Sequence, residues 1–83
     1  MKKYYVKKPI VIEAIQWEGT NIEEILDFCG ADQVILDNNR LYIETPFGEI
    51  YIKVRDYIVK GKQGEFFSAT EDVLLKYYEE YKK

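Results

Sequence analysis

Residues 4–17 read YYVKKPIVIEAIQW, a run dominated by β-branched and aromatic side chains. Such residues favour strands, so the run predicts a β-strand near the start of the chain. Pro9 cannot donate a hydrogen bond to a neighbouring strand, and we expect it at an edge or at the start of the well-paired part. Side chains alternate between the two faces of a strand, and here both faces are apolar: Val11, Ile15 and Trp17 on one, Ile10, Ile12 and Ala14 on the other. The strand should therefore be covered, at least in part, on both sides.

A short helix is predicted to follow this strand. Thr20-Asn21-Ile22-Glu23 matches the capping box that starts many helices, and Asn21 with Glu24 offers the same pattern one residue later. Apolar or small side chains then recur at helical spacing: Ile22, Ile25, Leu26 and Cys29. Gly30 is a good helix stop. The pattern predicts a helix over about residues 21–29, with acids in its first turn that suit the helix dipole.

The middle of the chain predicts short strands joined by turns. Strand patterns occur in five segments: Gln33–Leu36, Arg40–Thr45, Glu49–Val54, Tyr57–Lys60 and Glu65–Ser68. Turn residues separate them: Asp37-Asn38-Asn39, Thr45-Pro46-Phe47-Gly48 (with Pro and Gly where a type I turn prefers them) and Gly61-Lys62-Gln63-Gly64. We expect the carboxylate of Asp56 to cap the backbone N–H groups of a further turn.

The last predicted element is an amphipathic helix over about residues 70–81. Ser68 with Glu71 forms another capping box, and Thr70 is a competing cap. Its apolar side chains recur at helical spacing: Val73, Leu74, Tyr77, Tyr78 and Tyr81. We therefore expect one α+β domain over residues 1–83. It should contain a curved antiparallel sheet or small open barrel of about five to six strands, with a short helix after strand 1 and the amphipathic helix at the C-terminus.

Composition limits the chemistry available to the chain. The single cysteine, Cys29, precludes an intrachain disulfide, and we see neither a signal-peptide pattern nor a long apolar run, which predicts a cytoplasmic protein without a membrane partner. The chain has no histidine, which removes the commonest proton-transfer side chain and any Cys/His zinc site. Glu13 and Glu44 could serve as paired carboxylates, but nothing in the sequence brings them together. We therefore expect no enzyme, no catalytic residue, no metal site and no cofactor.

Charge is distributed unevenly along the chain, whose formal net charge is −3. Residues 9–39 carry seven acids and no base. An acidic surface attracts a basic partner, and tyrosines are enriched at protein interfaces. The candidate partner surface therefore comprises acids of the first helix and tyrosines of the last: Glu23, Glu24, Asp27, Tyr77 and Tyr81. The alternative is that these acids only keep the protein soluble, and that the tyrosines pack the last helix on the first strand.

Four cations in the second half of the chain are candidate anion contacts: Lys53, Arg55, Lys60 and Lys62. They could hold the phosphates of a nucleotide in a pocket between sheet and helix. Nucleic-acid binding would require a denser basic stripe, so the charge pattern argues against it.

Four stretches form a pattern when they are taken in order and spacing: Lys8–Trp17 (KPIVIEAIQW), Ile25–Gly30 (ILDFCG), Asp56–Gly61 (DYIVKG) and Gly64–Phe67 (GEFF). Together they resemble a widespread family of small bacteriophage and prophage proteins of uncharacterised function. That family reads "KPVVIEAVQW", a short helix, "PGDYIIKG", "GEFY" and a final helix. Two departures stand out. Val54-Arg55 replaces the Pro-Gly that commonly precedes the Asp, so a tight turn is lost or remodelled, and Ser68-Ala69 replaces a frequent Pro-Cys.

The resemblance implies a setting in a phage-infected host cell but no established reaction. The leading hypothesis is a phage-derived accessory protein that acts by binding and inhibits a host or defence protein. A first alternative is a small virion structural or assembly component, or a homo-oligomer built through exposed sheet edges. A second is a small-molecule binder that takes up a nucleotide.

Overall fold

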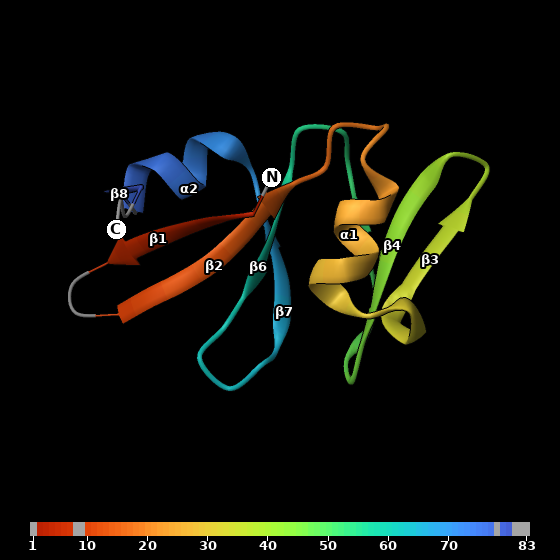
Figure 1. The fold of residues 1–83 in the computed structure, drawn as a ribbon, viewed down its shortest axis with the longest axis horizontal. Helices are drawn as coiled ribbons and strands as arrows, with labels where there is room; N and C mark the ends of the chain where they lie inside the picture. The colour runs from red at the N-terminus through yellow and green to blue at the C-terminus, as the bar shows by residue number, and fades with distance from the viewer. Residues whose placement is uncertain (1, 8–9, 78, 81–83) are drawn as a thin grey trace.

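The computed structural model describes residues 2–7, 10–77 and 79–80, which form an α+β fold (Figure 1). Its strands make two antiparallel sheets. The larger has the order β7 (Phe66–Ala69), β6 (Tyr57–Lys60), β2 (Ile10–Gln16), β1 (Lys3–Lys7) and β8 (Glu79–Glu80). The smaller has the order β3 (Val34–Asp37), β4 (Arg40–Thr45) and β5 (Gly48–Ile52). The helices are α1 (Ile22–Cys29) and α2 (Glu71–Tyr77), and a 3₁₀ turn, η1 (Ala31–Gln33), precedes β3.

The first predicted strand is in fact a hairpin. β1 and β2 pair antiparallel from Lys3 opposite Ala14 to Lys7 opposite Ile10, and Pro9 lies between them, outside the described residues. The prediction of one strand over residues 4–17 is therefore wrong, and α1 follows the second strand instead of the first. Composition does not show where such a run turns back, because both arms of the hairpin have the same strand propensity.

The predicted curved sheet or open barrel is correct only in being antiparallel. The described residues form eight strands, divided between two sheets, and the sheets do not close into a barrel. The division falls where β5 ends at Ile52, two residues before the predicted end at Val54, and the chain turns before β6. In that turn the Asp56 N–H donates to the Lys53 carbonyl (2.9 Å), so these residues leave the ladder.

The core explains how the two sheets are held together. One cluster joins both sheets through α1: Ile15, Trp17, Ile25, Cys29, Leu41, Ile43, Ile52 and Ile58. A second cluster lies under α2: Ile12, Ala14, Tyr57, Val59 and Leu74. β2 contributes to both clusters, which confirms the prediction that it is covered on both faces. It follows that α1 and α2 lie against opposite faces of the larger sheet (Figure 1).

The start of α1 does not use the predicted capping box, because no side chain caps it. The Asn21 side chain instead links the helix to the preceding strand. Its Oδ1 accepts a hydrogen bond from the Glu18 N–H (2.8 Å), and its Nδ2 donates to the Gln16 carbonyl (2.9 Å). These two bonds fix how α1 leaves β2, and therefore where its acidic residues lie.

The C-terminal helix is shorter than predicted. Thr70 is the cap, since its Oγ1 accepts a hydrogen bond from the Val73 N–H (3.2 Å), whereas Ser68 lies within β7. α2 ends at Tyr77, and β8 then pairs with β1, with Tyr5 opposite Glu80. The predicted helix over residues 70–81 is therefore too long. Glu79 and Glu80 pair with the edge strand β1 instead of extending the helix. Residues 78 and 81 lie outside the described residues.

The turn at Val54-Arg55 keeps a backbone conformation that glycine prefers. Arg55 has φ +84°, which L side chains rarely adopt. Its N–H donates to the Trp17 carbonyl (2.6 Å), and its carbonyl accepts from Gln16 Nε2 (2.9 Å). Asp56 Oδ2 accepts from the Lys53 N–H (3.3 Å), which confirms the predicted turn-capping carboxylate. The hydrogen bonds of its own N–H and carbonyl therefore hold Arg55 in this turn.

Replacing the buried leucine of α2 should test the second core cluster. Leu74 is 0% exposed and the neighbouring Leu75 is 57% exposed. We expect Leu74→Ala to lower the free energy of unfolding by about 2–5 kcal/mol, because it leaves a cavity in the core. The matched control, Leu75→Ala, should change it by no more than about 0.5 kcal/mol. Urea unfolding followed by circular dichroism measures both values, and equal losses would show that α2 does not pack as described.

Arg55 allows a second stability test. Glycine has no Cβ to clash at positive φ, so Arg55→Gly should relieve a strain of about 1 kcal/mol. The exposed ion pair between Arg55 and Glu71 (3.6 Å) is lost in any such variant and contributes little. The control is Arg55→Ala, which removes the same side chain and keeps the strain. We expect Arg55→Gly to melt higher than Arg55→Ala, and the reverse order would contradict the assigned turn geometry.

Candidate functional site

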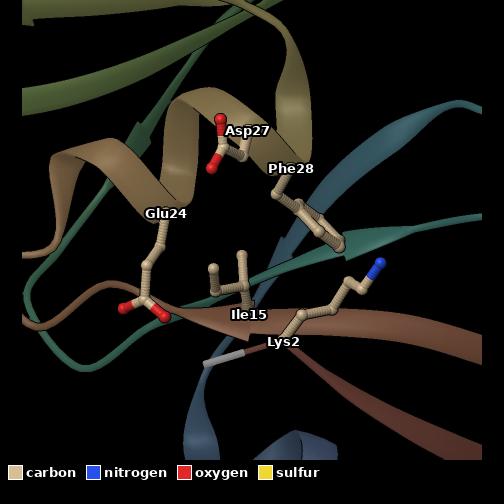
Figure 2. A pocket seen from close by; sticks show the side chains of 5 residues that line it. All are labelled: Lys2, Ile15, Glu24, Asp27 and Phe28. Atoms are coloured by element: carbon tan, nitrogen blue, oxygen red, sulfur yellow. The ribbon is translucent and has the colours of Figure 1, made fainter.

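A small recess lies between α1 and the start of the larger sheet. It has a volume of about 190 Å³ and is lined by Lys2, Ile15, Glu24, Asp27 and Phe28. Glu24, Asp27 and Phe28 are spaced three and four residues apart, so they share one face of the helix. Figure 2 shows Glu24 and Phe28 reaching down from α1 on either side of Ile15, with Lys2 opposite the helix.

The floor of this recess is apolar and well supported. Ile15 is 1% exposed and belongs to the core cluster that joins the two sheets. The Phe28 ring packs against the Phe66 ring of β7 with centroids 6.0 Å apart, and Lys60 Nζ lies 5.9 Å from the Phe66 centroid. The floor therefore consists of side chains that the core already holds in place.

Of the charged residues that line the recess, two are acidic and one is basic. Glu24 and Asp27 supply two carboxylates from α1, and Lys2 supplies one ammonium group. Lys2 Nζ forms an ion pair with Glu13 of β2 (3.1 Å), which offsets its charge. A recess of this size is below the roughly 300–1,000 Å³ of typical small-molecule pockets, and it suits a single side chain. An apolar floor below an acidic rim matches a lysine or arginine, whose aliphatic stem can be buried while its cation stays at the surface.

The structure brings together only part of the predicted partner surface. Glu23, Glu24 and Asp27 all lie on α1. Tyr77 is the last residue of α2, which packs on the opposite face of the larger sheet, and Tyr81 lies outside the described residues. The acids of α1 and the end of α2 therefore lie on opposite sides of the larger sheet. Ile15, Phe28 and Lys2 were not predicted as neighbours of the acids, although the four-residue spacing from Glu24 to Phe28 places these two side chains on one face.

The predicted anion contacts are also separated. Lys53 and Arg55 precede β6, whereas Lys60 ends it and Lys62 follows it. A strand of four residues at about 3.3 Å per residue keeps the two pairs more than about 10 Å apart. Arg55 is further engaged by Glu71, and Lys60 lies over the Phe66 ring. The four cations therefore do not converge on one phosphate group.

A second, larger hollow of about 290 Å³ lies between the β4–β5 and β6–β7 loops. It is lined by Gln33, Glu44, Thr45, Pro46 and residues 63–66. Several of its polar groups serve their own loops: the Thr45 hydroxyl accepts from the Phe47 N–H (3.1 Å) and donates to the Gly48 carbonyl (2.7 Å), and Glu65 Oε1 accepts from the Gln63 N–H (3.1 Å). These groups stabilise the two loops, so we regard the recess at α1 as the better candidate site.

The two carboxylates considered for acid–base chemistry lie in different sheets. Glu13 belongs to β2 and pairs with Lys2, whereas Glu44 is an exposed residue of β4. Within the described ranges, no group of three or more cysteine, aspartate or glutamate residues is placed to hold a metal ion. None of the helices in those ranges has the length and apolar character needed to cross a bilayer.

No protein-family model, no curated protein and no solved structure matches the chain. The resemblance to small phage proteins therefore stays a prediction from the sequence motifs. The site must be judged on its own geometry.

Cys29, at the end of α1, provides a probe of how firmly the helix is seated. Burial, opposed in part by the positive charge of Lys60, raises the pKa of its thiol to about 12. The reactive thiolate is therefore scarce in the folded protein at pH 8. We expect iodoacetamide to modify native Cys29 at least 100-fold more slowly than it modifies the urea-unfolded chain, as measured by intact mass.

The pH dependence of that reaction has a defined sign. The thiol of the unfolded chain should reach its full rate above about pH 9, whereas the rate for the folded protein should still be rising at pH 10. A native rate that levels off near pH 9 would show an accessible thiol, and hence an α1 that is not packed between the sheets as described.

Proposed function

We propose that this protein is a phage-derived accessory protein that acts by binding, and that it inhibits a host or defence protein. The recess beside α1 receives a basic side chain of that partner. The phage setting is supported only by the sequence motifs at Lys8–Trp17, Asp56–Gly61 and Gly64–Phe67. The binding mode is supported by the geometry of the recess.

The observation that carries the proposal is an apolar floor directly beneath an acidic rim. Phe28, beside the buried Ile15, offers contact area to a methylene chain, and Glu24 and Asp27 offer carboxylates to its charged end. Glu23, exposed on the same helix, adds a third negative charge close by. Because α1 is held by two sheets at once, these groups are fixed before the partner arrives, which lowers the entropic cost of binding.

Acidic residues next to a preformed recess would act on both the rate and the strength of binding. Their summed field would attract a basic surface, and this effect should weaken as salt increases. The buried contact of the aliphatic stem would hold the complex once formed, and it should depend little on salt. Binding that weakens with salt but does not vanish is therefore the expected signature.

The test is an affinity purification from bacterial lysate followed by titration of the partner identified. The variant Glu23→Lys/Glu24→Lys/Asp27→Lys reverses the charge of the helix face. We expect it to weaken binding of the purified partner at least tenfold in calorimetry, because the rim would then repel the basic side chain. The matched control is Asp72→Lys in the first turn of α2, on the other face of the larger sheet, and it should bind as the unaltered protein does.

Two outcomes would contradict the proposal. One is that the unaltered chain recovers no specific partner. The other is that the triple variant, shown by circular dichroism to be folded, binds the partner as well as the Asp72→Lys control does.

A further inference from the structure

The three-stranded sheet has one face that no core cluster covers. Leu41, Ile43 and Ile52 point toward α1, so the residues that alternate with them point the other way. Register places these outward residues in three rows across the strands. The middle row is apolar (Ile35, Tyr42, Tyr51), and one flanking row is acidic (Glu44, Glu49). The other flanking row pairs Asp37 with Arg40, and Lys53 lies next to it in sequence, just past the end of β5. We call this surface the outer face.

The middle row forms an aromatic strip on this face. Tyr42 and Tyr51 are directly opposite each other, with ring centroids 5.4 Å apart and planes inclined by 37°. Tyr51 is 46% exposed, and Ile35 and Tyr42 are half-buried. None of the three belongs to either core cluster. Tyrosines paired in this way offer rigid contact area at low entropic cost, which is typical of protein interfaces.

The acidic row is electrostatically unfavourable in the isolated chain. Glu44 and Glu49 are opposite each other across the β4–β5 ladder, both are exposed, and neither forms an ion pair among the described residues. Like charges placed directly opposite in a sheet are destabilising. A cation supplied from outside would remove this repulsion.

The basic row holds the complementary charge. Arg40 begins β4, and Lys53 directly follows Ile52, the last paired residue of β5, which is opposite Leu41. Both side chains are exposed, and Asp37, opposite Arg40 in β3, reduces the charge of this row to a net +1. The outer face thus runs from negative through aromatic to positive along the strands.

We propose that a second copy of this chain covers the outer face. A two-fold axis through the Tyr42–Tyr51 row places the acidic row of one copy over the basic row of the other, twice, and stacks the two aromatic strips at the centre. Such an interface is isologous, because the same patch on both copies is self-complementary. Self-association through sheet edges is the alternative expected from the sequence, whereas this interface uses a sheet face. It does not depend on the function proposed above, since α1 packs on the other side of the same sheet.

The size of the face sets the expected strength of the dimer. Three strands about 4.8 Å apart and about five residues long cover far less than the roughly 800 Å² per partner of a standard stable interface. We therefore expect a weak dimer that forms as concentration rises and dissociates on dilution. Its charge contacts are exposed at the rim, so it should also weaken with added salt.

The experiment uses paired charge reversals on the full chain, followed by light scattering over a range of concentrations. Variant A is Glu44→Lys/Glu49→Lys, and variant B is Arg40→Glu/Lys53→Glu. The unaltered protein should rise from the monomer mass of 9.9 kDa toward twice that value. Each variant alone should lower the association constant at least tenfold, because like rows then meet. An equimolar mixture of A and B should restore association, because every row again meets its opposite.

The controls separate this interface from the recess at α1 and from loss of folding. Glu23→Lys/Asp27→Lys alters α1 only and should dimerise as the unaltered protein does. Tyr42→Ser/Tyr51→Ser removes the aromatic strip without changing charge and should also weaken the dimer at least tenfold. Circular dichroism checks that each variant is folded.

Three results would each overturn the proposal. The first is an unaltered protein that stays monomeric up to millimolar concentration, which would leave the outer face to a different protein or to solvent. The second is a dimer that the tyrosine replacements and variants A and B leave intact. The third is a mixture of A and B that associates no better than either variant alone.

Discussion

The fold depends on the burial of β2 on both of its faces. A strand with apolar side chains on both faces cannot remain at the surface, because each exposed aliphatic side chain loses about 1.5–3 kcal/mol of favourable transfer free energy. Ile12 and Ala14 therefore require α2, and Ile15 requires α1. The position of the three-stranded sheet is then determined, because α1 packs between Ile15 and the apolar face of β4. The rest of the architecture follows from covering this one strand.

The same constraint determines which side chains remain for binding. Ile25 and Cys29 must face the core, so the helix can present Glu24, Asp27 and Phe28 only beside the sheet, next to Ile15. Likewise, Leu41 and Ile43 must face α1, which leaves Tyr42 and Glu44 on the outer face. Neither surface needs residues of special reactivity. Each consists of the residues that alternate with a buried set.

The sequence predicts the elements whose signals are local. Arg40–Thr45 and Tyr57–Lys60 are strands with the predicted ends, and both helices exist where apolar spacing places them. The errors concern strand pairings, which depend on contacts formed only in the folded protein. Pro9 is a local sign that the run 4–17 is interrupted, but it does not show that the two arms pair with each other. No local signal shows that the last helix ends early and that pairing with β1 follows. Of the site, the acids of α1 were predicted, but Ile15 and Lys2 became their neighbours only through tertiary packing.

The two surfaces lie on opposite sides of the three-stranded sheet, and this has a consequence for binding. A dimer joined through the outer faces would carry both α1 recesses away from the interface, where a partner could reach them. Two recesses on one dimer would bind a partner with repeated or symmetric basic sites more tightly than one recess, since the second contact forms within the complex. Weak self-association and weak recognition of one side chain would then combine into tighter binding. The dimer would thus raise the affinity for such a partner above the value that the contact area of a single recess can supply.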